Sequence, residues 1–132
     1  MRILFFFILS CTLYAETWSV VYMSKSIKIK KSDIKNIYFK KIKQKNGRQI
    51  VPLNLYSSNP ARIAFLSKVL NSDLNSWDKY YDEQYFSGIK SPLVLKSKEA
   101  MMKFLYEVDG SIGYIPTKKV DANLTELTRF EF

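Results

Sequence analysis

The stretch LYSSNPARIAF, residues 55–65, brings hydroxyl, amide and guanidinium groups together at a predicted helix start. Ser58 or Asn59 can cap this helix, and Pro60 suits its first position because the N–H that proline lacks would be unpaired there. Arg62 then falls in the first turn, where the helix dipole favours anions over cations. Backbone N–H groups, hydroxyls and a guanidinium together can bind an oxyanion. The spacing predicts an oxyanion site made of Ser57, Ser58, Asn59 and Arg62.

A second interpretation of the same residues needs no ligand. Ser58 and Asn59 would only cap the helix, and Arg62 would be a surface residue or the partner of a nearby carboxylate. The sequence leaves both interpretations open. If the first holds, Arg62→Ala is expected to weaken anion binding and to leave the fold intact.

The composition argues against catalysis and against a metal site. The chain contains no histidine, and Cys11 is its one cysteine. Histidine is both the commonest metal ligand and the commonest general base, so its absence excludes Cys-His and Ser-His-Asp systems. The neighbouring carboxylates at 82–83 and at 107 and 109 are explained by solvated helix faces. We expect a protein that is not an enzyme and has no metal or cofactor.

Residues 1–15, MRILFFFILSCTLYA, have the pattern of a secretory signal peptide. A single cation, Arg2, precedes an apolar run from Ile3 to Leu9 that is too short to span a bilayer. Cleavage after the small residue Ala15 is predicted, which places the rest of the chain in the periplasm. Alternatively, the residues that end at Cys11 loosely match a lipidation motif, with Cys11 as the acylated residue.

The net charge is +9, and much of it lies in residues 25–48, which contain ten Lys or Arg residues and one acid, Asp33. The export signal and the preference for lysine over arginine argue against a nucleic-acid surface, because lysine offers point charges rather than bidentate contacts. We expect a solvated basic face that attracts phosphorylated ligands, lipid headgroups or acidic proteins.

Strands and helices alternate along residues 16–132, a length of 117 residues that suffices for one compact domain. Strands are expected at 18–23 and 111–115, with an edge strand in 123–132. Asn46-Gly47 predicts a tight turn between the segments 40–44 and 49–55. Helices are expected over 33–39, 60–70 and 74–86 and after Ser97. This order indicates a single α/β layered domain.

Two of these helices have apolar stripes that should cover the sheet. The predicted buried residues are Ile63, Leu66, Val69, Phe104, Leu105 and Val108. Truncation of Phe104 to alanine is expected to cost about 3–5 kcal/mol, as for buried aromatic residues in general.

The order of these signals resembles the C-terminal lobe of the phosphate ABC transporter substrate-binding proteins, in the periplasmic binding protein-like superfamily. The resemblance covers about residues 18–118 and rests on five blocks: Ser32–Phe39, Asn46-Gly47, Ser57–Arg62 with Phe65, Lys79–Gly88 and Val108–Ile115. Aspartate stands where the family usually has proline before the glycine of the last block. The threonine that usually follows the glycine of the polar loop is also missing.

The resemblance implies one lobe of a type 2 periplasmic binding protein, with phosphate or a similar anion bound by a polar loop at a helix N-terminus. Ser57, Ser58, Asn59 and Arg62 fall where that loop falls. It also implies a membrane transporter or sensor protein as a partner. Family receptors enclose the anion between two lobes, whereas 117 residues hold one. The sequence therefore leaves open a module that binds no small ligand and docks through Tyr56, Trp77 and Tyr81.

Overall fold

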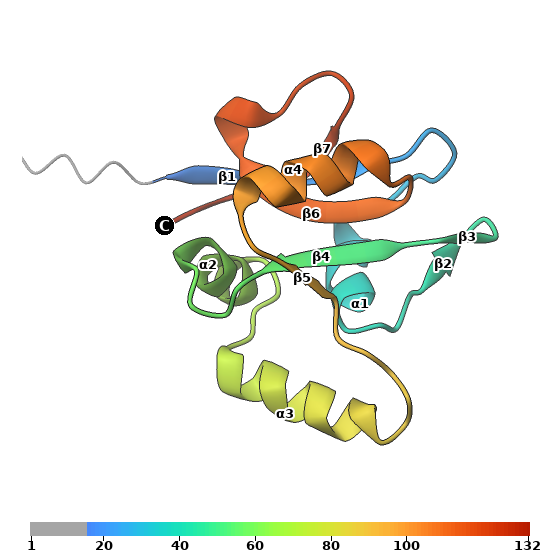
Figure 1. Cartoon of the computed structure of the whole chain (residues 1–132), viewed down its shortest axis with the longest axis vertical. Coiled ribbons are helices and arrows are strands. Elements are labelled where there is room, and N and C mark those ends of the chain that lie inside the picture. The colour runs from blue at the N-terminus through green and yellow to red at the C-terminus, as the bar shows by residue number, and fades with distance from the viewer. Residues whose placement is uncertain (1–15) are drawn as a thin grey trace, which may run out of the picture.

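The computed structural model describes residues 16–132, so the predicted signal peptide and Cys11 lie outside the described residues. A five-stranded mixed sheet in the order β5-β4-β6-β1-β7 forms the centre of the domain (Figure 1). Its strands are β1 (Thr17–Met23), β4 (Val51–Leu55), β5 (Leu93–Leu95), β6 (Ser111–Pro116) and β7 (Thr125–Glu131). β4 is parallel to β5 and to β6, whereas β1 is antiparallel to β6 and β7.

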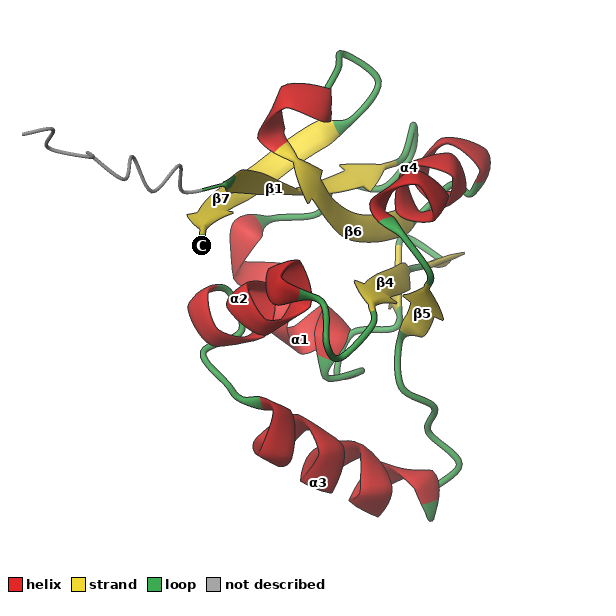
Figure 2. Ribbon diagram, turned by 60° about the vertical axis from the view of Figure 1, so that its left-hand side comes forward, coloured by secondary structure: helices red, strands yellow, loops and turns green. Residues whose placement is uncertain are grey.

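Helices cover both faces of the sheet, as expected for an α/β layered domain (Figure 2). α4 lies on one face, and α1 and α2 lie on the other. The bounds are η1 (Lys31–Asp33), α1 (Ile34–Tyr38), α2 (Pro60–Lys68), α3 (Leu74–Tyr85), α4 (Lys98–Glu107) and η2 (Thr117–Lys119). Successive residues of β6 alternate between the two layers, because Tyr114 stacks on Phe65 of α2 and Gly113 lies against Met101 of α4.

The capping and turn residues explain where the elements begin. Asn59 caps α2, since its side chain accepts the N–H of Ala61 at 2.9 Å, and Ser97 caps α4 in the same way. Asn46 and Gly47, both with positive φ, connect the two short strands β2 (Gln44–Lys45) and β3 (Arg48–Gln49). The predicted helices and C-terminal edge strand are confirmed within one to three residues at most ends. The predicted turn at Asn46-Gly47 is confirmed, but the strands that it joins have only two residues each, and residues 51–55 pair in the main sheet instead.

α3 lies outside α1 and α2, away from the sheet (Figure 1). Two buried aromatic residues attach it: Trp77 packs against Phe39 at the end of α1, and the Tyr81 hydroxyl donates to the carbonyl of Tyr38. Trp77 is 2% exposed and Tyr81 is 7% exposed. Both are therefore unavailable as docking anchors, contrary to the expectation from the sequence, and their hydrophobic stripe holds α3 to the domain.

The predicted core is partly right. Leu66 and Leu105 are buried, while Val69, Phe104 and Val108 are half-buried. Ile63 is 47% exposed, so its predicted burial is wrong. The inner face of α2 is centred instead on a set of smaller and aromatic residues that flank Arg62: Ala61, Ala64, Phe65 and Leu66.

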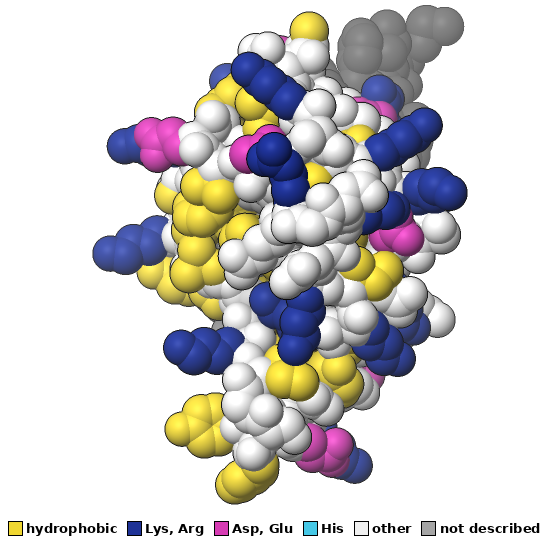
Figure 3. All heavy atoms as spheres, turned by 90° about the vertical axis from the view of Figure 1, so that its right-hand side faces the viewer, with side chains coloured by type: hydrophobic (Ala, Val, Ile, Leu, Met, Phe, Trp, Pro, Cys, Tyr) yellow, Lys and Arg dark blue, Asp and Glu magenta, His cyan; other side chains and the backbone are white. Residues whose placement is uncertain are grey.

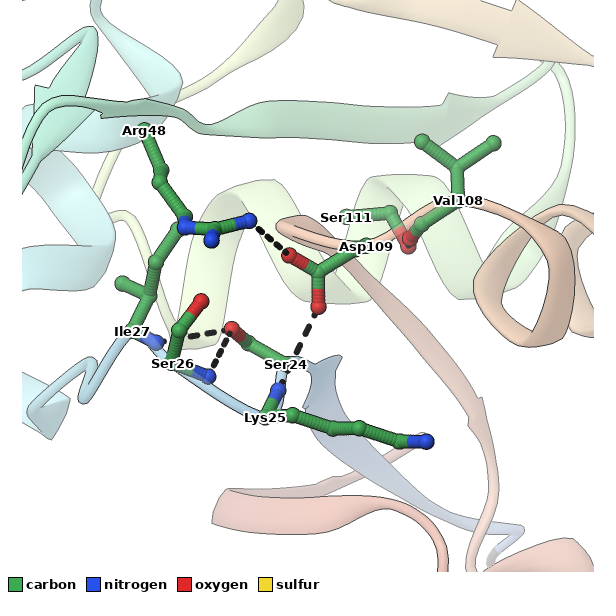
Figure 4. A network of polar contacts seen from close by, with 8 residues as sticks. All are labelled: Ser24, Lys25, Ser26, Ile27, Arg48, Val108, Asp109 and Ser111. Carbon is green, nitrogen blue, oxygen red and sulfur yellow. Dashed lines mark hydrogen bonds and ion pairs between the residues drawn. The ribbon is translucent and has the colours of Figure 1, made fainter.

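The turn between α4 and β6 depends on Gly110. Its φ is +83°, and a Cβ added there would lie 2.4 Å from the carbonyl oxygen of Gln49. Its neighbour Asp109 accepts the backbone N–H of Lys25 at 3.3 Å and pairs with Arg48 at 3.8 Å, which closes the turn against two other segments (Figure 4).

We expect Gly110→Ala to lower the free energy of unfolding by at least about 2 kcal/mol, because both the left-handed backbone and the clash with a main-chain oxygen oppose the new methyl group. Gly47→Ala is the matched control: its φ is +73°, but nothing lies within 4 Å of the added Cβ. It should lose only about 1 kcal/mol. Urea denaturation of the two variants measures the difference, and equal losses would show that the contact with Gln49 can relax.

Within residues 16–132, no helix combines the length and the hydrophobicity needed to cross a bilayer.

Candidate anion-binding site

The candidate site lies on the loop that joins β4 to α2. β4 is flanked by the parallel strands β5 and β6, so the carboxyl ends of three strands meet at this edge of the sheet. Such edges are where ligands bind in open α/β sheets. The loop is a turn in which the N–H of Asn59 donates to the carbonyl of Tyr56 at 3.0 Å.

The loop presents several donors that have no partner in the described part of the chain. Ser57 and Ser58 are exposed, and neither hydroxyl forms a hydrogen bond within residues 16–132. The backbone N–H groups of Ser57, Ser58 and Arg62 are also free of hydrogen bonds to these residues. Asn59 differs from them, because its side-chain oxygen already accepts the N–H of Ala61. The cap and the candidate site thus share one loop.

Arg62 is positioned differently from a surface residue. It is 7% exposed, and its Nη1 donates to the carbonyl oxygen of Leu55 at 2.9 Å. Its Cζ lies 5.8 Å from the ring centroid of Trp77, within the range of a cation–π contact. Helical side chains tilt toward the N-terminus, so a long residue in the first turn of α2 reaches back to the end of β4.

The charge of Arg62 is poorly compensated. Burial lowers the pKa of its guanidinium, and Tyr114 and Asp78 oppose this shift only in part. The ion pairs within residues 16–132 are Lys45–Asp33, Arg48–Asp109 and Arg129–Glu126, so no described carboxylate lies within 4.0 Å of Arg62. Because arginine stays protonated even when it is buried, a cation with no carboxylate in direct contact lies under this loop.

Two buried tyrosines fix the strand end that carries the loop. β4 pairs with β6 only at Val51 and Pro52, and beyond this point hydroxyl groups bridge the two strands. The Tyr114 hydroxyl donates to Asn54 Oδ1 and accepts the N–H of Leu55 at 3.0 Å. Desolvation raises the pKa of Tyr114, so its hydroxyl remains a donor at neutral pH.

The hydroxyl of Tyr38 also bridges β4 and β6, two residues earlier along β4 than the contact between Tyr114 and Leu55. Its hydroxyl lies 2.7 Å from the carbonyl oxygen of Leu53 and 3.2 Å from that of Ile112. The carbonyl of Leu55, which accepts from Arg62, is therefore held by a rigid strand end.

Ser57, Ser58, Asn59 and Arg62 all lie at the start of α2, but their solvent exposure differs. The two serines face solvent, Asn59 is half-buried and Arg62 lies underneath. Tyr114, Asn54 and Trp77 support the site and were not part of the predicted set. Tyr114 and Trp77 come from distant segments and Asn54 lies three residues before Ser57, so their contact with the site depends on the fold.

Comparison with solved structures shows which fold this is. A Clostridium perfringens protein described as a phosphate ABC transporter substrate-binding protein, solved with bound phosphate, matches with a TM-score of 0.66 and 16% identity. An ABC-type phosphate transport receptor from Vibrio cholerae has a TM-score of 0.57 and 14% identity, and PstS from Borrelia burgdorferi has 0.61 and 17%. In each case 86% of this chain is covered.

The match covers 45%, 46% and 48% of those three proteins, so the chain spans about half the length of the solved structures that it resembles. It has the fold of one lobe of these periplasmic binding proteins. The likeness lies in the fold rather than in the sequence, since no family model and no curated protein matches the chain.

Proposed function

We propose that the chain is an exported, single-lobe module that binds phosphate or a similar oxyanion at the β4–α2 loop. The observation that carries the proposal is the buried guanidinium of Arg62, which has no carboxylate within 4.0 Å among the described residues and lies at the N-terminus of a nine-residue helix. An anion bound there would compensate this charge and the positive end of the helix dipole.

The remaining contacts come from the loop above Arg62. The hydroxyls and N–H groups of Ser57 and Ser58 would donate to the oxyanion from the solvent side, and Asn59 would keep the helix start in place. Because both serines are exposed, the site is open, and we expect weak binding that salt weakens further.

The resemblance to phosphate transport receptors supports phosphate as the first ligand to test, together with a non-enzymatic role. It also supports export to the periplasm and a membrane transporter as the partner that receives the ligand. Cleavage after Ala15 belongs to this proposal, with acylation of Cys11 as its alternative.

We expect Ser57→Ala/Ser58→Ala to weaken phosphate binding about tenfold, because two hydroxyl donors are lost and each contributes about 0.5–1.5 kcal/mol. Both side chains are exposed, so the fold should be unchanged. Isothermal titration with phosphate and sulfate at two ionic strengths measures the effect. The control is Ser67→Ala/Ser87→Ala, two exposed serines away from the loop. Unchanged affinity in the loop variant would remove the hydroxyls from the site.

A second function, a docking module without a small ligand, is favoured by one observation. Tyr56 and Ile63 are each 47% exposed and flank the start of α2, where they form apolar surface next to the candidate site. Absence of any heat with phosphate or sulfate in the unmodified protein, at both ionic strengths, would favour this function over the first.

A further inference from the structure

A basic groove lies at the other end of α2 from the candidate phosphate site. It encloses about 780 Å³ and is formed by η1 and α1, by the end of α2 and by β7. The residues that line it are Lys30, Lys31, Ser32, Ile34, Lys35, Lys68, Val69, Thr128 and Arg129. Five of these nine residues are cationic and none is acidic. α2 has nine residues, so its two ends are about 13 Å apart.

The lysines of this basic groove keep their charge available. None of its four lysines belongs to an ion pair within residues 16–132. Asp33 pairs with Lys45, outside the groove, at 2.7 Å, whereas Glu126 pairs with Arg129 of the groove at 2.7 Å, so the four lysines carry the available charge. Lys68 is directed by a hydrogen bond to the carbonyl of Glu131, which holds it at the β7 side of the groove.

Buried isoleucines and exposed lysines alternate along residues 27–30, the segment that leads into the groove. Ile27 and Ile29 are 4% and 3% exposed, whereas Lys28 and Lys30 between and after them are exposed. This period-two pattern turns lysines outward from an extended segment. Cationic side chains also outnumber acidic ones on the face drawn in Figure 3. The groove is therefore continued by the exposed Lys28 on the segment that leads into it.

We infer that this basic groove is a docking surface for the phosphate headgroups of an anionic membrane. Clusters of four to eight Lys or Arg residues bind anionic lipid surfaces. Lysine suits diffuse headgroup charge, whereas bidentate recognition of one phosphate group uses arginine. The aliphatic floor of Ile34 and Val69 accommodates the lysine stems as their ammonium groups reach outward.

The position of the groove in the chain supports a membrane as the occupant. The N–H of Glu16 donates to the carbonyl of Phe132. Arg129 of the groove lies opposite Ser19 in the antiparallel ladder between β1 and β7. The groove thus begins three residues, or about 10 Å of strand, from Glu16. If Cys11 is acylated, which is the alternative to cleavage after Ala15, the acyl group would attach the domain from this same end.

The test is sedimentation of the exported protein, purified from the periplasm, with vesicles of phosphatidylcholine alone and with mixed phosphatidylglycerol and phosphatidylcholine vesicles. The N-terminus of the protein is the same in both measurements, so the additional binding to the mixed vesicles, called here the phosphatidylglycerol increment, reports the charged surface. Lys31→Glu/Lys35→Glu should reduce the phosphatidylglycerol-dependent partition coefficient at least tenfold. The control, Lys79→Glu/Lys103→Glu, changes the net charge by the same amount at exposed residues of α3 and α4. It should keep at least half of the additional binding to the mixed vesicles.

High salt should abolish the increment by screening, and inorganic phosphate at matched ionic strength should not compete with it. Competition by phosphate would overturn the inference in favour of a soluble ligand. Equal losses in the two double variants would reduce the effect to net charge. Neither variant alters the β4–α2 loop, so phosphate titration of the same proteins separates a failure here from a failure of the proposed function.

Discussion

Phe65→Ala should lower the free energy of unfolding by about 3–5 kcal/mol, the range found when buried aromatic residues are truncated. Phe65 is 1% exposed and lies where three elements meet. Its ring contacts Tyr38 at 4.7 Å and Tyr114 at 4.3 Å between centroids, and Phe130 of β7 at 5.9 Å. Truncation would leave a cavity beside the two tyrosines that hold the end of β4, so the loop should loosen with the core.

Phe104→Ala is the matched comparison, because the sequence predicted an equally large loss there. Phe104 is only half-buried in α4, and we now expect a loss of about 1–2 kcal/mol. Urea denaturation of both variants, with the near-ultraviolet circular dichroism of the aromatic cluster, tests the ranking. If the two losses are equal, the packing of α2 on the sheet is placed wrongly.

Local signals predicted the elements because each signal acts over a few residues. Asn59 and Ser97 satisfy N–H groups two or three positions away, and Asn46-Gly47 fixes its own turn. β5 was missed for the opposite reason. It has three residues, Leu93 and Val94 are about half exposed, and only its pairing with β4 makes it a strand.

The candidate site was predictable in composition but not in arrangement. The polar loop and the cap follow from residues 57–60. The burial of Arg62 depends on Trp77, fifteen positions further on in another helix, and on the carbonyl of Leu55 at a strand end that Tyr114 holds. The same helix turns Ile63 to solvent, since its small residues Ala61 and Ala64 let Phe65 approach the sheet. Apolar periodicity alone could not distinguish these orientations.

The geometry of Arg62 changes what its replacement should do to the fold. From the sequence, Arg62→Ala was expected to leave the fold intact, but a side chain that is 7% exposed and hydrogen-bonded to Leu55 cannot be removed without cost. We expect a loss of about 2–4 kcal/mol, from the broken hydrogen bond and the cavity above Trp77. Thermal unfolding followed by tryptophan fluorescence measures this loss, and a loss below about 1 kcal/mol would place Arg62 at the surface after all.

Arg62→Met separates anion binding from stability. Methionine keeps most of the side-chain length but has no charge, so the broken bond to Leu55 is offset by relief of a buried cation. Its stability should lie within about 1 kcal/mol of the unmodified protein. Phosphate affinity should nevertheless fall at least tenfold, because charge-assisted hydrogen bonds contribute about 1.5–3 kcal/mol. Titration of phosphate into this variant decides between the two roles of Arg62: undiminished binding in a stable Arg62→Met protein would remove the guanidinium from the anion site and leave the N–H groups and hydroxyls of the loop as the donors.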